Sequence, residues 1–236
     1  MESLTFESLA GGESVARNFS DWLHTYVDFA SVSAAPRRMH FWSGVSAIAA
    51  VLRRKVYFDQ IRFRWTPNFF VIFVAPPGIA TKSTTADTAL DLAKEVANIK
   101  FGPNIVTWQS LAKSFSEALE AYPDEWGEFQ SMSAVTTVSA ELGNLLNPRD
   151  GDLISLLITL WDGRDVRKET KMSGNDSIVN PWFNLIGCTT PSWIADNVPL
   201  NVVEGGFTSR CVFIYADAKD KLVPYLEDTV GPKDAD

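Results

Sequence analysis

The sequence predicts an α/β protein with a mostly parallel β-sheet flanked by helices. Apolar runs of strand length alternate along the chain with segments whose apolar residues recur at helical spacing. The clearest strand, Asn68 to Val74, is a continuous β-branched and aromatic run, as expected for a central strand buried on both faces. A glycine-containing loop and a helix follow it directly, as expected where a strand leads into a crossover connection.

Two helices and a hairpin precede this strand. Apolar residues recur at helical spacing after Ser20-Asp21, which offers a cap, and Pro36 opens a second helix. The hairpin is indicated by two alternating segments around a short turn. The expected elements are helices at 18–29 and 36–52, packed as an N-terminal cap beside the sheet, and hairpin arms at 55–59 and 61–65.

Strands and helices continue to alternate after the loop. The expected helices are 83–96, 111–119, 142–146 and 153–160, and the expected strands are 105–106, 134–138, 182–187 and 211–215. We expect three parts: 1–58, a helical cap with the start of the hairpin; 59–216, the core; and 217–236, an acidic tail or linker.

Composition limits the function classes. A formal charge of -8 argues against a wholly basic nucleic-acid coat, so any DNA site must be a local basic patch. Cys188 and Cys211 lie in apolar runs, which favours reduced thiols over a disulfide framework. Neither a signal peptide nor a membrane-length apolar run is present in the sequence. We therefore expect a soluble, cytoplasmic protein that has no membrane partner.

The loop after Val74 predicts a binding site for ATP. Loop amides and a helix N-terminus present partial positive charge to phosphates, and the order strand, loop, Lys82-Ser83, helix is that of a P-loop. Lys82 is expected to reach the β- and γ-phosphates, Ser83 to bind Mg2+, and Thr84 to contact the α-phosphate. The expected binding residues are Pro77, Gly78, Ile79, Ala80, Thr81, Lys82, Ser83 and Thr84.

The loop departs from the regular P-loop pattern. Pro76 and Thr81 occupy the two glycine positions, and Gly78 alone remains inside the loop. Because Thr81 cannot adopt positive φ cheaply, we expect the loop to follow a modified path or to bind more weakly. The alternative is a proline-glycine turn with a solvated lysine.

Glu141 is the candidate acidic residue, since it follows the buried strand 134–138. A carboxylate at that position can bind Mg2+ or orient the attacking water. Ala140 stands where an aspartate is common, so metal binding would rest more heavily on Ser83, phosphate and water. Alternatively, Glu141 only caps the helix 142–146.

Two further groups are candidates for sensing the γ-phosphate. Thr189 ends the strand expected between the loop strand and the acid strand, with Thr190 and Asn184 as second choices; the alternative is turn and N-cap chemistry. Arg210 follows the Gly205-Gly206 pair and is a candidate arginine finger, in cis or from a neighbouring subunit. A structural salt bridge is the alternative for Arg210.

At this point the chain resembles the phage and prophage P-loop ATPases associated with replication, of the AAA+ and superfamily 3 helicase type, often found in primase-helicase polyproteins. The resemblance covers about residues 20 to 216. It is carried by the order of the segments 40–44, 67–70, 75–78, 82–84, 140–143, 160–163, 187–191 and 205–210. It implies the ATPase domain of a replicative DNA helicase, in the bacterial cytosol if phage-encoded, that forms a homo-oligomer such as a hexamer.

A second hairpin is the candidate DNA contact. Ser173 to Asp176 reads as a turn between two segments that can pair, and in the related hexameric helicases a hairpin at this place lines the pore. Arg167, Lys168 and Lys171 are expected to meet the phosphates of single-stranded DNA. A solvated hairpin is the alternative, and the cluster Arg53-Arg54-Lys55 with Arg37-Arg38 is equally open.

The expected function is ATP hydrolysis coupled to movement on DNA. An ATP-dependent assembly or loader switch without translocation is the alternative, and stimulation of ATPase turnover by single-stranded DNA separates the two. A small-molecule kinase is a third reading, because a P-loop fold does not by itself give function. The absence of a clear arginine-rich lid in the sequence weighs against the kinase.

Overall fold

A computed structural model of the chain describes residues 21–61, 63–124, 126–170 and 174–221. Its main sheet has five strands in the order β4-β5-β8-β3-β9. The strands are β4 (Leu119–Pro123), β5 (Phe129–Ser139), β8 (Trp182–Thr189), β3 (Phe70–Val74) and β9 (Cys211–Tyr215). All neighbours pair in parallel except β4, which is antiparallel to β5. The expectation of a mostly parallel α/β sheet is confirmed.

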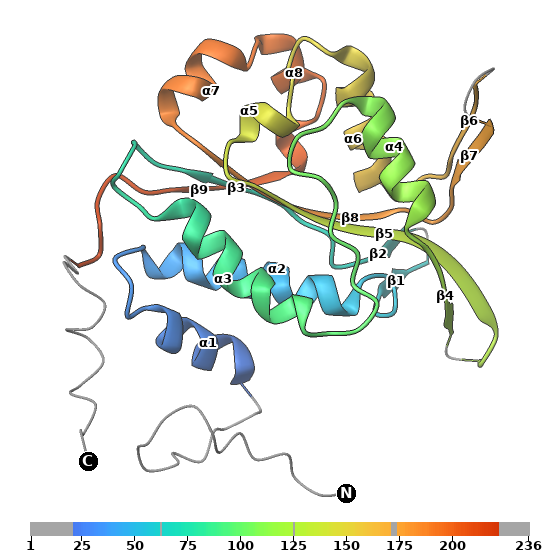
Figure 1. Cartoon of the computed structure of the whole chain (residues 1–236), viewed down its shortest axis with the longest axis horizontal. Helices are drawn as coiled ribbons and strands as arrows, with labels where there is room; N and C mark the ends of the chain where they lie inside the picture. Colours follow the sequence, from blue (N-terminus) through green and yellow to red (C-terminus); the bar gives the residue numbers. More distant parts are fainter. Residues whose placement is uncertain (1–20, 62, 125, 171–173, 222–236) are drawn as a thin grey trace, which may run out of the picture.

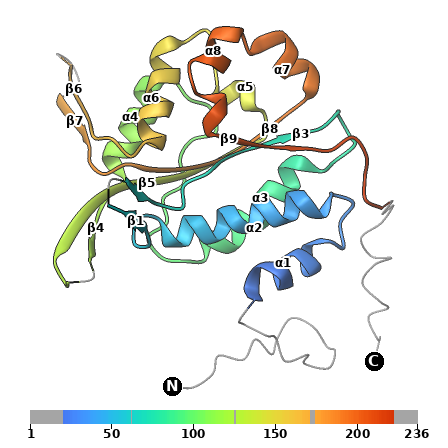
Figure 2. The ribbon, with the colours of Figure 1, turned by 180° about the vertical axis from the view of Figure 1, so that it is seen from behind.

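Helices cover both faces of this sheet (Figure 1). One face carries α2 (Arg37–Leu52) and α3 (Lys82–Lys94), and α1 (Trp22–Ala30) packs on the outer side of α2. The other face carries α4 (Trp108–Glu117), α5 (Leu142–Leu145), α6 (Gly151–Trp161), α7 (Pro191–Asn197) and α8 (Leu200–Glu204). The view from behind shows the same two helical layers (Figure 2).

The central strand β3 explains why the sequence shows no polar alternation there. All five of its residues are buried, because helices cover it on both sides. Val71 and Phe73 pack into the α1–α3 layer, whereas Phe70, Ile72 and Val74 pack into the opposite layer. A strand that packs against apolar side chains on both faces needs apolar residues at every position.

Both expected hairpins form, with shifted bounds. β1 (Phe58–Gln60) pairs antiparallel with β2 (Phe63–Trp65), so the first arm begins later than expected. β6 (Val166–Thr170) pairs antiparallel with β7 (Gly174–Ile178). The predicted turn at Ser173 to Asp176 is wrong in part, because residues 174–176 pair with β6 as strand.

The short strand predicted at Ile105-Val106 is wrong. Neither residue belongs to a strand; Val106 packs against the core while Ile105 is exposed. Instead, residues 100–102 run beside β5, where the amide of Gly102 donates to the Thr136 carbonyl at 2.8 Å. The outer position of the sheet is taken by β4, which contains Leu119, a residue predicted to end the preceding helix.

Local capping explains where several helices begin. The Asp21 carboxylate accepts from the amide of His24 at 3.2 Å, which confirms the cap expected before α1. Thr107 and Ser110 form a capping box that starts α4 three residues earlier than the apolar pattern indicated. The division into cap, core and acidic tail stays a prediction, and residues 222–236 of the tail lie outside the described part of the chain.

Candidate phosphate-binding site

Three neighbouring parallel strands end at one edge of the sheet and bring the candidate site residues together. In the register, Val74 at the end of β3 is opposite Thr189 at the end of β8, and Ser139 at the end of β5 is opposite Gly187. Glu141 follows Ser139 by two residues, and Thr189 likewise follows Gly187 by two. Glu141 and Thr189 therefore follow the paired residues of β5 and β8 at the same interval. Such an edge, beyond the carboxyl ends of parallel strands, is where α/β sheets bind ligands.

The loop that leaves β3 at this edge, residues 75–81, starts with a tie to β8. The Ala75 amide donates to the Thr189 carbonyl at 3.2 Å, so the two strands stay paired as the loop begins. Gly78 has φ 71° and is exposed, a conformation that a residue with Cβ adopts only at a cost. Thr81 has φ -73°, so the loop avoids the strained conformation at this position. The absence of positive φ at Thr81 agrees with the residue type, and a path that differs from the regular P-loop stays a prediction.

Lys82 is the first residue of α3 and folds back over this loop. Its Nζ donates to the carbonyl oxygen of Ala75 at 2.8 Å and lies 3.4 Å from that of Pro76. The side chain is half-buried, and burial lowers the pKa of its ammonium group. Lys82 is therefore hydrogen-bonded to the start of the loop, whereas the alternative interpretation expected a solvated lysine.

Cys188, near the end of β8, is not a charged partner for Lys82 at neutral pH. Burial raises the pKa of the Cys188 thiol to about 12, so the thiol is neutral under ordinary conditions. Cys211 is affected in the same way, and both cysteines are free. The expected reduced thiols are confirmed. An anion that approached Lys82 would meet no competing thiolate.

The start of α3 has unused hydrogen-bonding capacity. Thr81 makes no side-chain capping bond, and the Lys82 amide donates to the Ala80 carbonyl at 2.7 Å, which leaves the amides of Ser83 and Thr84 without an acceptor among the described residues. The hydroxyls of Ser83 and Thr84 have no hydrogen-bond partner within the described residues. A helix N-terminus of this kind attracts anions, and the two hydroxyls can bind phosphate oxygens or a cation.

Glu141 has an exposed carboxylate at the same edge. It occupies the N-cap position of α5 but makes no side-chain capping bond, so the capping alternative does not account for its carboxylate. The seat of α5 on the sheet depends on Gly187, because a Cβ there would lie 2.7 Å from Cδ1 of Leu142. The close approach fixes the chain immediately after Glu141.

The three residues proposed around the end of β8 have different surroundings. Thr189 is buried, and its hydroxyl has no hydrogen-bond partner among the described residues. The Thr190 hydroxyl caps α7 by accepting from the amide of Trp193 at 3.2 Å. Asn184 lies in the middle of β8, fully buried, and donates to the Ser46 carbonyl at 3.0 Å. The second choices Thr190 and Asn184 stay predictions: both side chains make a hydrogen bond within the fold, although the buried Oδ1 of Asn184 has no partner among the described residues.

Arg210 lies at the amino ends of the parallel strands, whereas the 75–81 loop leaves their carboxyl ends. It directly precedes β9, whose first residue is opposite Phe70, the first residue of β3. Five strand residues, about 16 Å, therefore separate its position from the loop. This separation favours a role toward a neighbouring subunit over a role in cis, and both stay predictions.

Arg210 is also engaged within its own chain. Its Nε and Nη2 donate to Oδ1 of Asp162 at 2.9 and 2.8 Å, and Nη1 donates to the Gly206 carbonyl at 2.8 Å. The guanidinium carbon lies 5.3 Å from the ring centroid of Trp161. Asp162 ends α6, far from Arg210 in sequence, and sequence reasoning assigned it no role although it lies in a segment that carried the resemblance.

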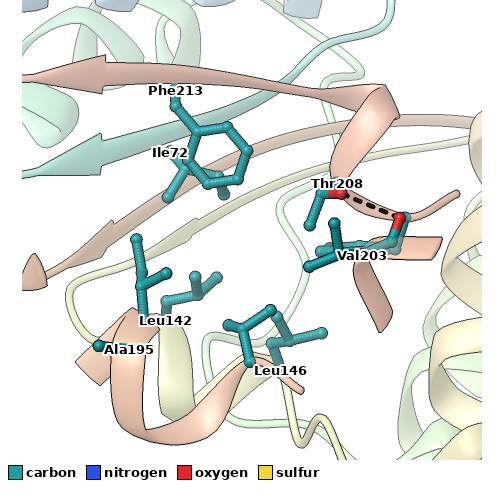
Figure 3. A pocket seen from close by; sticks show the side chains of 10 residues that line it. Ile72, Leu142, Leu146, Ala195, Val203, Thr208 and Phe213 are labelled. Atoms are coloured by element: carbon teal, nitrogen blue, oxygen red, sulfur yellow. Dashed lines mark hydrogen bonds between the residues drawn. The ribbon is translucent and has the colours of Figure 1, made fainter. Parts of the chain in front are cut away.

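An apolar cavity of about 320 Å³ lies beside the candidate site (Figure 3). Ile72 of β3 and Phe213 of β9 form one side, and Leu142 and Leu146 around α5 form another. Thr208 contributes a hydroxyl, which donates to the Val203 carbonyl at 3.4 Å. This cavity suits an apolar group and cannot compensate the charge of a triphosphate.

The predicted DNA contacts are only partly described. Arg167 and Lys168 belong to β6, but their side chains and all of Lys171 lie outside what the structure describes. The β6–β7 hairpin is at the end of the molecule opposite the 75–81 loop (Figures 1 and 2). In the second basic cluster, Arg53 is buried against Glu120 at 2.5 Å, and Arg37 bonds Asp28 at 2.7 Å. These two arginines have structural partners.

No protein-family model matches the chain, and no curated protein matches it either. Among the described residues, no cluster of three or more histidine, cysteine, aspartate or glutamate side chains could hold a metal ion. None of the helices in this part of the chain combines the length and apolarity needed to cross a membrane. The fold and site define an α/β protein with a mostly parallel sheet and a polar ligand edge.

Proposed function

We propose that the chain is the ATP-hydrolysing motor domain of a replicative DNA helicase of the phage type. The observation that carries the proposal is the meeting of Lys82, Glu141 and Thr189 at one edge of the sheet, contributed from three adjacent parallel strands. The Glu141 and Thr189 side chains make no hydrogen bond within the described residues, and the Lys82 side chain bonds only carbonyls of the loop itself. Together they supply a cation, a carboxylate and a hydroxyl.

In this proposal the 75–81 loop and the first turn of α3 hold the phosphates of ATP. The Nζ of Lys82 exchanges the carbonyls of Ala75 and Pro76 for oxygens of the β- and γ-phosphates. A charge-assisted hydrogen bond is stronger than one to a neutral carbonyl, so this exchange is favourable. The uncapped amides of α3 add to the same positive potential.

The side chains present fit a magnesium ion bound with the nucleotide. The Ser83 hydroxyl and the Glu141 carboxylate are oxygen ligands without a partner among the described residues, and Mg2+ prefers one or two such ligands with phosphate and water. Ser83 follows β3 and Glu141 follows β5, and these strands lie on either side of β8. At about 4.8 Å between neighbouring strands, β3 and β5 are separated by roughly 10 Å. Bound Mg2+ would neutralise developing charge on the phosphates.

Glu141 and Thr189 then face the γ-phosphate, on the side from which water attacks. Glu141 accepts a hydrogen bond from the attacking water and orients it toward the γ-phosphorus. Thr189 donates its hydroxyl to a γ-phosphate oxygen, because β8 lies between the loop strand and the acid strand. Loss of the γ-phosphate removes that acceptor, which gives β8 a means to sense hydrolysis.

The position of Arg210 supports an oligomer in this proposal. It lies at the amino ends of the parallel strands, away from the loop, which favours contact between its guanidinium and a γ-phosphate in a neighbouring subunit. To make that contact the guanidinium must leave Asp162, which holds it at 2.8 Å within its own chain. Exchange of Asp162 for a phosphate keeps the guanidinium paired with an oxyanion.

Replacing Arg210 with alanine and Asp162 with asparagine separates the finger role from a structural one. Each change breaks a pair whose side chains are only 23% and 13% exposed, so each should lower the free energy of unfolding by about 1–3 kcal/mol. Only Arg210→Ala should also reduce ATPase turnover, by at least tenfold, at protein concentrations that favour assembly. Thermal unfolding and turnover are measured on both variants. Equal loss of turnover in the two would assign Arg210 a structural role alone.

The proposal is tested by ATPase turnover with and without single-stranded DNA. A motor that moves on DNA should hydrolyse ATP faster when an oligonucleotide is bound, because binding and hydrolysis share one cycle. ATP binding with turnover that DNA does not change would favour the loader switch instead. Failure to bind ATP would remove both.

A further inference from the structure

The β1–β2 hairpin carries three large aromatic side chains on one face. Opposite residues of an antiparallel pair point to the same side, and the register pairs Phe58 with Trp65 and Gln60 with Phe63. Phe58, Phe63 and Trp65 are exposed by 62%, 63% and 52%. The ring centroids of Phe63 and Trp65 lie 6.3 Å apart. Three exposed rings on so short a hairpin form a surface that the described core does not cover.

The same hairpin is basic. On its other face, Arg64 bonds Asp59 at 3.4 Å, and its guanidinium carbon lies 4.1 Å from the centroid of the Tyr57 ring. From Lys55 to Trp65 the sequence contains three cations and one carboxylate, while the whole chain has a formal charge of -8. A local excess of positive charge in an acidic protein indicates an anionic partner.

We propose that residues 55–65, the aromatic hairpin, bind single-stranded nucleic acid. Bases stack on the rings of Phe58, Phe63 and Trp65, and backbone phosphates meet Lys55, while Arg64 on the other face adds to the positive potential of the hairpin. Every base has a π-face, so aromatic stacking combined with cations grips a strand without reading its sequence. The choice of DNA as the strand rests on the proposed function; the binding surface itself does not depend on ATP.

A second exposed aromatic site supports the role of charge. Trp126 and Phe129, in and beside the turn between β4 and β5, are exposed by 82% and 78%. Asp124 and Glu128 flank them, so this turn would repel phosphates. Both sites lie at the same end of the molecule, away from the 75–81 loop (Figures 1 and 2). The two hairpin turns thus differ in charge while sharing exposed aromatic rings.

The experiment compares a labelled oligo(dT) of about 20 nucleotides with an abasic strand of the same length, a size that spans one single-strand site. Binding is followed by fluorescence anisotropy at several salt concentrations, without ATP. Wild type should prefer oligo(dT), because the abasic strand has phosphates but no bases to stack. In the variant Phe58→Leu, Phe63→Leu, Trp65→Leu, oligo(dT) affinity should fall at least tenfold and the preference should vanish. Its salt dependence should persist, since the cations remain.

Two further variants complete the test. Trp126→Leu with Phe129→Leu removes two exposed rings at the acidic turn and should leave DNA affinity unchanged. Arg64→Gln should weaken both strands equally and flatten the dependence on salt. Circular dichroism and sedimentation of each variant report folding and self-association. The leucine substitutions keep apolar bulk, so a purely hydrophobic protein contact would survive them.

Two outcomes would overturn the proposal: equal wild-type affinity for the two strands, or unchanged oligo(dT) affinity in the leucine variant of the aromatic hairpin. In the second case, altered self-association would make this face an aromatic contact between protein molecules. Failure of the proposed ATPase function can be distinguished from failure of the hairpin proposal. If only the ATPase function fails, the protein still binds DNA without ATP but shows no ATP turnover.

Discussion

Replacing Lys82 with alanine should abolish ATP hydrolysis and leave the fold intact. Lys82 is the cation hydrogen-bonded to the start of the loop, and the loss of one preorganised donor to a reacting group costs about 10²–10³-fold in rate. The structural cost is small, because the hydrogen bonds lost are about 1 kcal/mol each and alanine relieves the burial of an ammonium group. Turnover and thermal unfolding should be measured on the same preparation.

Lys113→Ala is the matched control for this variant. Lys113 lies on α4 with its side chain 70% exposed and pairs with Glu117 at 3.7 Å, so its removal takes away one cation at little cost to stability. Turnover in the control should equal that of wild type. If Lys82→Ala also keeps wild-type turnover, the loop does not act on ATP and the proposed function fails.

The parts of the fold that could be predicted are those set by local sequence. The apolar run Cys211 to Tyr215 follows the polar residues Ser209 and Arg210 and forms β9 with those bounds. The loop and helix after β3 were predictable for the same reason, because the order strand, loop, lysine, helix is continuous in the chain. Residue type also predicted that Thr81 avoids positive φ, as it does.

Elements defined by pairing between distant segments were not predictable in this way. β4 is a strand only because it pairs with β5. Its residues are exposed or partly buried, and Glu120 and Pro123 interrupt the apolar pattern that would indicate a strand. Conversely, Ile105-Val106 looks like a strand but has no strand beside it. Apolar character alone does not decide whether a residue pairs as strand: Val106 packs against the core without a ladder of hydrogen bonds, and Ile105 is exposed.

The candidate site shows the same division. Lys82 and Ser83 were identified from one continuous motif, whereas the partner of Arg210 is 48 residues away and enters from α6. Asn184 illustrates the opposite case, because its position in β8 suggested a free polar tip while a helix from far upstream supplies a partner, Ser46. Which polar side chains are free to bind a ligand is a property of the packed structure.

Replacing Glu141 with glutamine should stop hydrolysis while ATP still binds. Glutamine keeps the size of the side chain and one carbonyl oxygen, but it cannot accept a proton or orient water as a carboxylate does, and loss of such a group costs about 10²–10⁴-fold. Binding rests mainly on Lys82 and the start of α3, so the dissociation constant for ATP should change far less than turnover. Equilibrium binding and single-turnover hydrolysis measure the two separately.

Glu95→Gln is the control, since Glu95 is exposed at the C-terminal end of α3, away from the ligand edge, and changes the net charge by the same amount. It should leave both binding and turnover unchanged. Because Glu141 makes no side-chain capping bond at α5, Glu141→Gln should unfold at the wild-type temperature. A lower unfolding temperature together with lost ATP binding would instead mean that the carboxylate stabilises the start of α5, and the catalytic assignment of Glu141 would be withdrawn.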